Sequence, residues 1–272
     1  MLTVSELHIY PVKSLAGIAL PAAGITNRGL QYDRRMMLVD SNHSFLTQRE
    51  YPQMALLQPA ITTDGFLMTH KHGATDSLFI PFKPARAETV MVTVWDDGCA
   101  AQVYDAAIND WFSKALEMEC KLVFMPDESI RYSDKRYSHD NEITSFADDF
   151  AMLLIGQSSL DDLNTRLKDQ LPMNRFRPNI VFTGGTPFVE DELGQFSIND
   201  IVFKAVKPCA RCVLTTIDQE TSAKSKEPLK TLATYRQKDN KILFGQNLVH
   251  HGTGFISIGD NIDITCYQPA AI

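Results

Sequence analysis

The sequence contains no run of about 18 apolar residues, which is the length that a membrane-spanning helix needs. Residues 1–6 lack the charged and apolar segments of a signal peptide. The net charge of the 272 residues is −7, so no basic excess is available to neutralise the phosphates of a nucleic acid or an anionic membrane surface. We therefore predict a cytoplasmic protein with no nucleic-acid and no membrane partner.

Cysteines are few and odd in number, five in all, which argues against a disulfide framework. Cys99, Cys120 and Cys266 are isolated among apolar or strand-like residues, and we predict that all three are buried small hydrophobic side chains. Only Cys209 and Cys212 form a cluster. The sequence also lacks a phosphate-binding loop and a dinucleotide fingerprint.

Strand-like segments dominate the sequence, without repeats, low-complexity tracts or long linkers. Short apolar or alternating runs are separated by turn signals, which predicts many short strands. Strand clusters that are interrupted by single helices favour an α+β, β-rich fold with barrel-like sheets over a doubly wound parallel sheet. The expected strands cover residues 4–10, 36–39, 55–57, 77–80, 89–95, 180–182, 201–206, 213–217 and 254–266.

Three segments have the apolar spacing of an amphipathic helix. Residues 107–118 carry one apolar stripe, and residues 160–171 repeat leucine at helical spacing after Ser158 or Ser159, either of which is a suitable N-cap. Residues 228–236 begin with a proline, which suits the first turn of a helix.

Cys209 and Cys212 have three interpretations from their residues alone. Structural zinc needs four ligands, and the other cysteines are too scattered to supply the missing two. A dithiol redox pair normally precedes a helix, whereas residues 213–217 are expected to form a strand. The third interpretation is a single thiolate ligand for a soft metal, with the cations Lys207 and Arg211 nearby.

Several cations follow predicted strands or turns. Lys13 and Ser14 come after the first strand, where an ammonium, a hydroxyl and free backbone N–H groups suit an anionic oxygen. Arg34 leads into another strand, and Arg177 precedes a proline that favours extended backbone before the next one. If Lys13, Arg34 and Arg177 converge, they would form a cage for a phosphate group.

These motifs, in this order, resemble the family of MOSC-domain proteins, and within it the bacterial YcbX-type proteins and the mitochondrial amidoxime-reducing components. The resemblance covers essentially the whole chain and implies a MOSC β-barrel domain packed with an N-terminal β-rich, MOSC-associated domain. We place the two domains at residues 1–120 and 121–272. The motifs that carry the resemblance are residues 10–14, 33–35, 145–148, 176–179, 207–218, 227–232 and 244–247.

The resemblance implies a molybdenum cofactor, a pterin that ends in a phosphate, held between the two domains. Cys212 is then the molybdenum ligand and the catalytic thiolate, while Cys209 is structural. The resemblance assigns cofactor binding to Lys13, Ser14, Arg34, Asp148, Arg177, Ala210 and Arg211. Pyridoxal phosphate binding is a further possibility at the level of the family. Two positions depart from the family pattern, Ser222 in a turn that often has glycine and Asp149 where mitochondrial relatives have a small hydroxyl residue.

The implied activity is a molybdenum oxidoreductase that reduces small N-hydroxylated compounds such as hydroxylamines, amidoximes and N-hydroxylated bases. The cysteines of this chain cannot hold an iron–sulfur cluster, so we expect electrons from a separate flavoprotein or ferredoxin-like protein. The alternative is a carrier of molybdenum cofactor or sulfur that uses Cys212.

Overall fold

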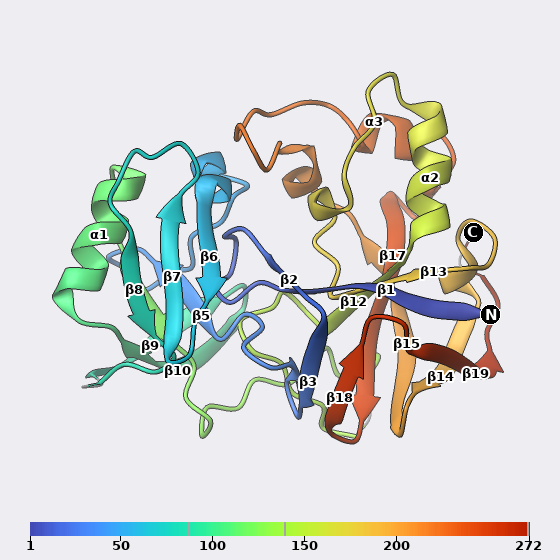
Figure 1. Cartoon of the computed structure of the whole chain (residues 1–272), viewed down its shortest axis with the longest axis horizontal. Coiled ribbons are helices and arrows are strands. Elements are labelled where there is room, and N and C mark those ends of the chain that lie inside the picture. Colours follow the sequence, from blue (N-terminus) through green and yellow to red (C-terminus); the bar gives the residue numbers. More distant parts are fainter. Residues whose placement is uncertain (86–87, 139, 271) are drawn as a thin grey trace.

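The computed structural model describes residues 1–85, 88–138, 140–270 and 272. Figure 1 shows a strand-rich molecule with a closed barrel on one side and a smaller group of sheets, here called the N-terminal lobe, on the other. The β-rich α+β fold expected from the sequence is confirmed. Among the described residues, no helix is long and apolar enough to cross a membrane.

The barrel consists of seven strands in the order β12-β13-β1-β19-β14-β15-β17, and a pairing between β17 and β12 closes it. β12 and β13 are parallel, and the other neighbouring pairs are antiparallel. Two short strands pair with barrel strands from outside the ring, β2 with β1 and β16 with β17. The bounds are β1 Leu2–Ile9, β2 Ile18–Leu20, β12 Met152–Gly156, β13 Ile180–Thr183, β14 Leu193–Ile198, β15 Ile201–Ala210, β16 Gln237–Lys238, β17 Lys241–His251 and β19 Asn261–Tyr267.

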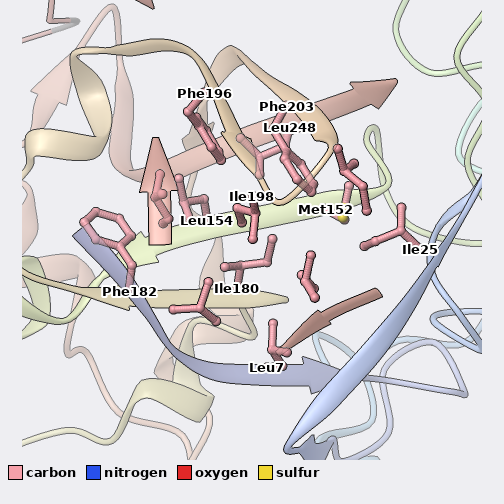
Figure 2. Packing of buried hydrophobic residues seen from close by; sticks show 14 of the residues in the cluster. Leu7, Ile25, Met152, Leu154, Ile180, Phe182, Phe196, Ile198, Phe203 and Leu248 are labelled. Atoms are coloured by element: carbon pink, nitrogen blue, oxygen red, sulfur yellow. The ribbon is translucent and has the colours of Figure 1, made fainter. Parts of the chain in front are cut away.

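The barrel interior is packed with aliphatic and aromatic side chains, as Figure 2 shows. Every barrel strand contributes at least one residue, because alternate side chains of a strand point to the same face. Phe196 and Phe203 stack with ring centroids 5.4 Å apart. Gly245, in the motif of residues 244–247, has φ 82°. A Cβ at this position would lie 2.7 Å from an Ile155 side-chain carbon, so only glycine lets β17 approach β12 this closely.

The N-terminal lobe contains a sheet in the order β5-β11-β10-β9 and a second sheet β6-β7-β8, with helix α1 beside them. A third small sheet, β18-β3-β4, joins a segment from each end of the chain. The bounds are β3 Ala22–Thr26, β4 Gly29–Leu30, β5 Met36–Val39, β6 Leu57–Ile61, β7 Gly65–His70, β8 Leu78–Pro81, β9 Glu88–Val94, β10 Asp97–Val103, α1 Ala106–Leu116, β11 Lys121–Phe124 and β18 Gly254–Ser257.

On each side of the expected division between residues 120 and 121, one strand pairs with the body on the other side. β1, at the start of the chain, pairs with β13 and β19 inside the barrel. β11, which follows the division, pairs with β5 and β10 in the N-terminal lobe. β1 and β11 thus each belong to the body on the other side of the expected division, and the division at residue 120 stays a prediction from the sequence.

All three expected helices exist, but α2 is shifted toward the N-terminus and α3 is much shorter than predicted. α1 is capped by the Asp105 carboxylate, which accepts from the backbone N–H of Ile108. α2 spans Gln157–Arg166 rather than residues 160–171, because Leu167 is extended and the Asn164 amide pairs with the backbone of Leu171. The expected serine N-cap was wrong, since Gly156 holds that position. α3 is a single turn, Leu229–Leu232.

Two further expectations were wrong. Residues 55–57 were expected to be a strand, but Pro52–Leu56 form a 3₁₀ helix that starts with proline, and β6 begins only at Leu57. Cys99 and Cys120 are buried as predicted, whereas Cys266 is exposed. Most of the side chains of β19 around Cys266 are also exposed. Two other 3₁₀ turns are Met173–Arg175 and Val189–Asp191.

Candidate functional site

One pocket at the junction of the barrel and the N-terminal lobe is lined by all eight residues that the resemblance assigned to a cofactor. They come from the segments after β1, before β5, before β12, before β13 and at the end of β15. The convergence of distant cations is therefore a property of the fold. The eight residues are Lys13, Ser14, Arg34, Asp148, Arg177, Ala210, Arg211 and Cys212.

Lys13 lies in a tight turn after β1, where its backbone N–H donates to the Met36 carbonyl. Its side chain is buried, and Nζ donates to the Phe146 carbonyl over 2.7 Å and to the Asp148 carboxylate. Burial lowers the pKa of Lys13, and the Asp148 carboxylate opposes that effect. The next residue, Ser14, has φ 65° and is also buried, so the Lys-Ser pair forms a rigid part of the pocket wall.

Arg34 and Arg177 hold the ring of Tyr10 between their guanidinium groups, 4.2 and 4.1 Å from the ring centroid. Asp33 accepts two hydrogen bonds from Arg34 Nη1, at 2.8 and 2.6 Å. Arg177 Nη1 donates to the Leu15 carbonyl over 2.7 Å. Burial lowers the pKa of Arg177 to about 10, so Arg177 remains charged at neutral pH.

Asp148 connects cations from both sides of the pocket. Its carboxylate accepts from Lys13, from Arg49 Nη2 over 2.8 Å and from Trp95 Nε1 over 3.1 Å. Burial acts to raise the pKa of Asp148, but Lys13 and Arg49 hold it well below its ordinary value. The side chain is still 47% exposed, so this carboxylate lies at the mouth of the pocket rather than in its floor.

Each cysteine of the pair accepts a hydrogen bond from a different arginine. Arg49 Nε lies 3.2 Å from Cys212 Sγ, and Arg211 Nη1 lies 2.9 Å from Cys209 Sγ. Both cysteines line the pocket, but Cys209, near the end of β15, also packs against the apolar cluster around Phe176, whereas Cys212 follows β15. The two thiols therefore have different surroundings.

The expected strand after Cys212 was wrong, because Val213–Thr216 form a 3₁₀ turn. The hydroxyls of Thr215 and Thr216 donate to the carbonyls three residues earlier, and this local bonding competes with extended backbone. The argument that strand context disfavours a dithiol pair therefore has no basis in the structure. Among the described residues, neither Cys209 nor Cys212 belongs to a group of three or more side chains with the spacing of metal ligands, so structural zinc at this pair has no support.

The pocket carries a strong excess of positive charge although the chain as a whole is acidic. Six cationic side chains and two carboxylates line it. One donor inside it is also unsatisfied, since Arg211 Nε is buried without a hydrogen-bond partner among the described residues. A buried cationic pocket with an unpaired donor is suited to an anionic ligand. The six cations are Lys13, Arg34, Arg49, Arg177, Lys207 and Arg211.

Sequence reasoning missed Arg49 entirely. This arginine contacts Cys212, Asp148 and the ring of Trp95, which lies 4.8 Å from its guanidinium carbon. Neither a motif nor a periodic pattern distinguishes Arg49 from other surface arginines in the sequence. Only the packing of the lobe segment between β5 and the turn at Pro52–Leu56 against the barrel brings it to Cys212.

Two family models match the chain. The one described as "MOSC N-terminal beta barrel domain" matches residues 1–119, and the one described as "MOSC domain" matches residues 141–263. Together these matches cover most of the sequence, including every segment that lines the pocket.

Named relatives fall into two groups. Mitochondrial amidoxime-reducing component 1 is 32% identical in Mus musculus and 31% identical in Homo sapiens, and each alignment covers 96% of this chain and 81% or 82% of the relative. Molybdenum cofactor sulfurase from Oryza sativa subsp. japonica is 34% identical over 89% of this chain, which spans only 32% of that relative. The solved structure of the YUAD protein from Bacillus subtilis aligns over 98% of both chains at 9% identity, with a TM-score of 0.42.

Proposed function

Because the chain belongs to the family of MOSC-domain proteins with an N-terminal MOSC β-barrel domain, we propose that it is a molybdenum-cofactor oxidoreductase that reduces N-hydroxylated compounds. The observation that carries the proposal is the pocket in which Cys212 lies among six cations. The cofactor would carry a soft metal at one end and a phosphate at the other. A thiolate suits the metal, and cationic donors suit the phosphate.

The residues of the pocket fit this cofactor in charge and in donor type. Lys13, Arg34 and Arg177 would bind its phosphate and pterin, and the unsatisfied Arg211 Nε would gain a partner. Asp148 would act mainly by holding Lys13 and Arg49 in place, since its carboxylate already accepts hydrogen bonds from both. When bound, the cofactor would supply the two-electron chemistry that removes one oxygen from an N–OH group and releases it as water.

The chain itself contributes a ligand and its orientation. Cys212 would bind the metal through Sγ, and Arg49 would fix the direction of that sulfur while also bonding to Asp148. The two electrons would come from a separate flavoprotein or ferredoxin-like donor. The substrates we propose are small hydroxylamines, amidoximes and N-hydroxylated bases. A cytoplasmic location stays a prediction from the sequence.

A second candidate is a carrier that uses Cys212 to hold sulfur or to transfer the cofactor. The similarity to molybdenum cofactor sulfurase favours it, although this chain spans only about a third of that relative. A carrier would bind cofactor or sulfur without reducing a substrate.

The test is to express the chain in a host that makes the cofactor and to measure molybdenum per chain and reduction of an amidoxime with an artificial electron donor. We expect about one molybdenum per chain, loss of both metal and reduction in Cys212→Ser, and no loss in the exposed and remote variant Cys266→Ser. Zinc that is bound without molybdenum and is lost in Cys212→Ser would refute the proposal. Metal or cyanide-labile sulfur without any reduction would instead support the carrier.

A further inference from the structure

A second group of metal-type side chains lies outside the cationic pocket. Asp140, Glu142 and His251 each direct one ligand atom into a common region, with all three atoms within 4.8 Å of one another. They line a separate cavity at the end of β17. His250 and His251 are adjacent in the sequence, and neither lines the cationic pocket.

His251 and its neighbour have different partners. His250 Nε2 contacts the Thr26 carbonyl at 2.7 Å, so this ring belongs to the packing between β17 and the β3–β4 turn. His251 Nε2 is buried and has no hydrogen-bond partner among the described residues, although an Asp140 carboxylate oxygen lies 3.3 Å away. A buried imidazole nitrogen that faces carboxylates without a good hydrogen bond is in the position of a metal ligand.

The carboxylates are also held in place. Glu142 accepts from the backbone N–H of Asp140 over 2.9 Å, which ties the two acidic residues together. Lys204 Nζ forms a long, exposed ion pair with Asp140 Oδ2 at 3.9 Å, a type of pair that contributes little.

An independent observation comes from Ser133, which lines the same cavity and is only 2% exposed. Its hydroxyl oxygen has no hydrogen-bond partner among the described residues. Because buried hydroxyls are nearly always satisfied, this oxygen indicates a missing partner such as a metal-bound water.

We propose that Asp140, Glu142 and His251 form a binding site for a divalent first-row transition metal ion such as zinc, with Ser133 bonding to a water on the metal. One imidazole and two carboxylates suit zinc, cobalt or manganese, whereas magnesium and calcium prefer oxygen ligands alone. Three protein ligands leave positions open for water. The site does not depend on the molybdenum cofactor, because it shares no lining residue with the cationic pocket.

Cobalt tests the proposal, because its visible spectrum distinguishes nitrogen and oxygen ligands from thiolates. Cobalt(II) chloride is titrated into the purified full chain, with His251→Gln and Asp140→Asn as site variants. The control is His8→Gln, since His8 pairs with the single carboxylate of Glu6 at 2.7 Å, away from this cavity. We expect one equivalent of cobalt without a sulfur charge-transfer band in wild type and control, and affinity weaker by about ten-fold or more in both site variants.

Three results would overturn the proposal. Equal cobalt affinity in wild type and His251→Gln would show that the histidine is not a ligand. A sulfur charge-transfer band that accounts for all bound cobalt would move binding to the cysteines. Displacement of the cobalt by an excess of magnesium would exclude a site that selects transition metals.

Discussion

Arg49 Nε lies 3.2 Å from Cys212 Sγ, and Nη2 of the same guanidinium lies 2.8 Å from the Asp148 carboxylate. One side chain of the N-terminal lobe thus contacts the proposed metal ligand and an acid in the segment that leads into β12. The flat fork of an arginine makes both contacts at once, whereas the single ammonium of a lysine has no such geometry.

We predict that Arg49→Gln lowers the molybdenum content of the purified protein by on the order of ten-fold, because a group that orients a metal ligand typically has an effect of this size. Arg49→Lys should recover only part of the loss. The matched control is Arg35→Gln. Arg35 is likewise paired with an aspartate, Asp127, and stacked on an aromatic ring, that of Phe124, but it lies outside the pocket. Elemental analysis of all three variants checks this, and equal losses in the Arg49 and Arg35 variants would contradict it.

Arg177→Lys should reduce the pterin content several-fold while the chain stays folded, because lysine cannot reproduce the donor fork that binds a phosphate. Arg236→Lys is the matched control. Arg236 is also a buried arginine on an aromatic ring, that of Phe188, but it pairs with Asp191 away from the pocket. Pterin released by acid and measured by fluorescence reports retention, and circular dichroism reports folding. An unchanged pterin content in Arg177→Lys would refute the assignment.

Glu190 is completely buried, and burial raises the pKa of its carboxyl to about 7 from an ordinary 4.5. The folded chain therefore holds this proton more tightly than the unfolded chain does. It follows that the free energy of unfolding falls as pH rises from 4.5 to 7, by about 3 kcal/mol for this group alone.

Glu190→Gln should remove this fall, since an amide does not titrate, and should stabilise the protein at pH 8 relative to wild type. Urea unfolding at pH 5 and pH 8 measures the difference, with the exposed Glu192→Gln as a control. Parallel stability curves for wild type and Glu190→Gln between these two pH values would contradict the prediction.

The buried amides of Gln48 and Gln219 bind each other across 171 positions of the sequence, with N–O distances of 3.3 and 3.0 Å. Gln219→Ala leaves part of the Gln48 amide without a partner, and we expect a loss of about 1–3 kcal/mol in the free energy of unfolding. The exposed Gln237→Ala should cost less than about 0.5 kcal/mol. A double-mutant cycle with Gln48→Ala measures the pair, and strictly additive single effects would show that the two amides do not interact.

Much of the local structure was readable from the sequence because hydrophobic periodicity reports burial directly. Apolar and alternating runs identified β1, β5, β8 and β9, and the apolar stripe of residues 107–118 identified α1, whereas β7, β10 and β11 of the lobe were not predicted. Prediction from the local sequence failed where side-chain hydrogen bonds to the backbone compete with strand pairing. Thr215 and Thr216 look like strand residues, yet their hydroxyls bond to nearby carbonyls and produce a 3₁₀ turn.

The sequence by itself determined the β-rich class, the family and the types of side chain in the pocket. Motifs that follow one another in a fixed order can be recognised without any knowledge of contacts. Tertiary structure alone decided that Lys13, Arg34 and Arg177 line one pocket with Cys212, and that Arg49 joins them. The physical reason is that barrel closure and docking of the lobe bring together residues far apart in the sequence, such as Arg49 and Cys212 at 163 positions, and such separations leave no periodic signal in the chain.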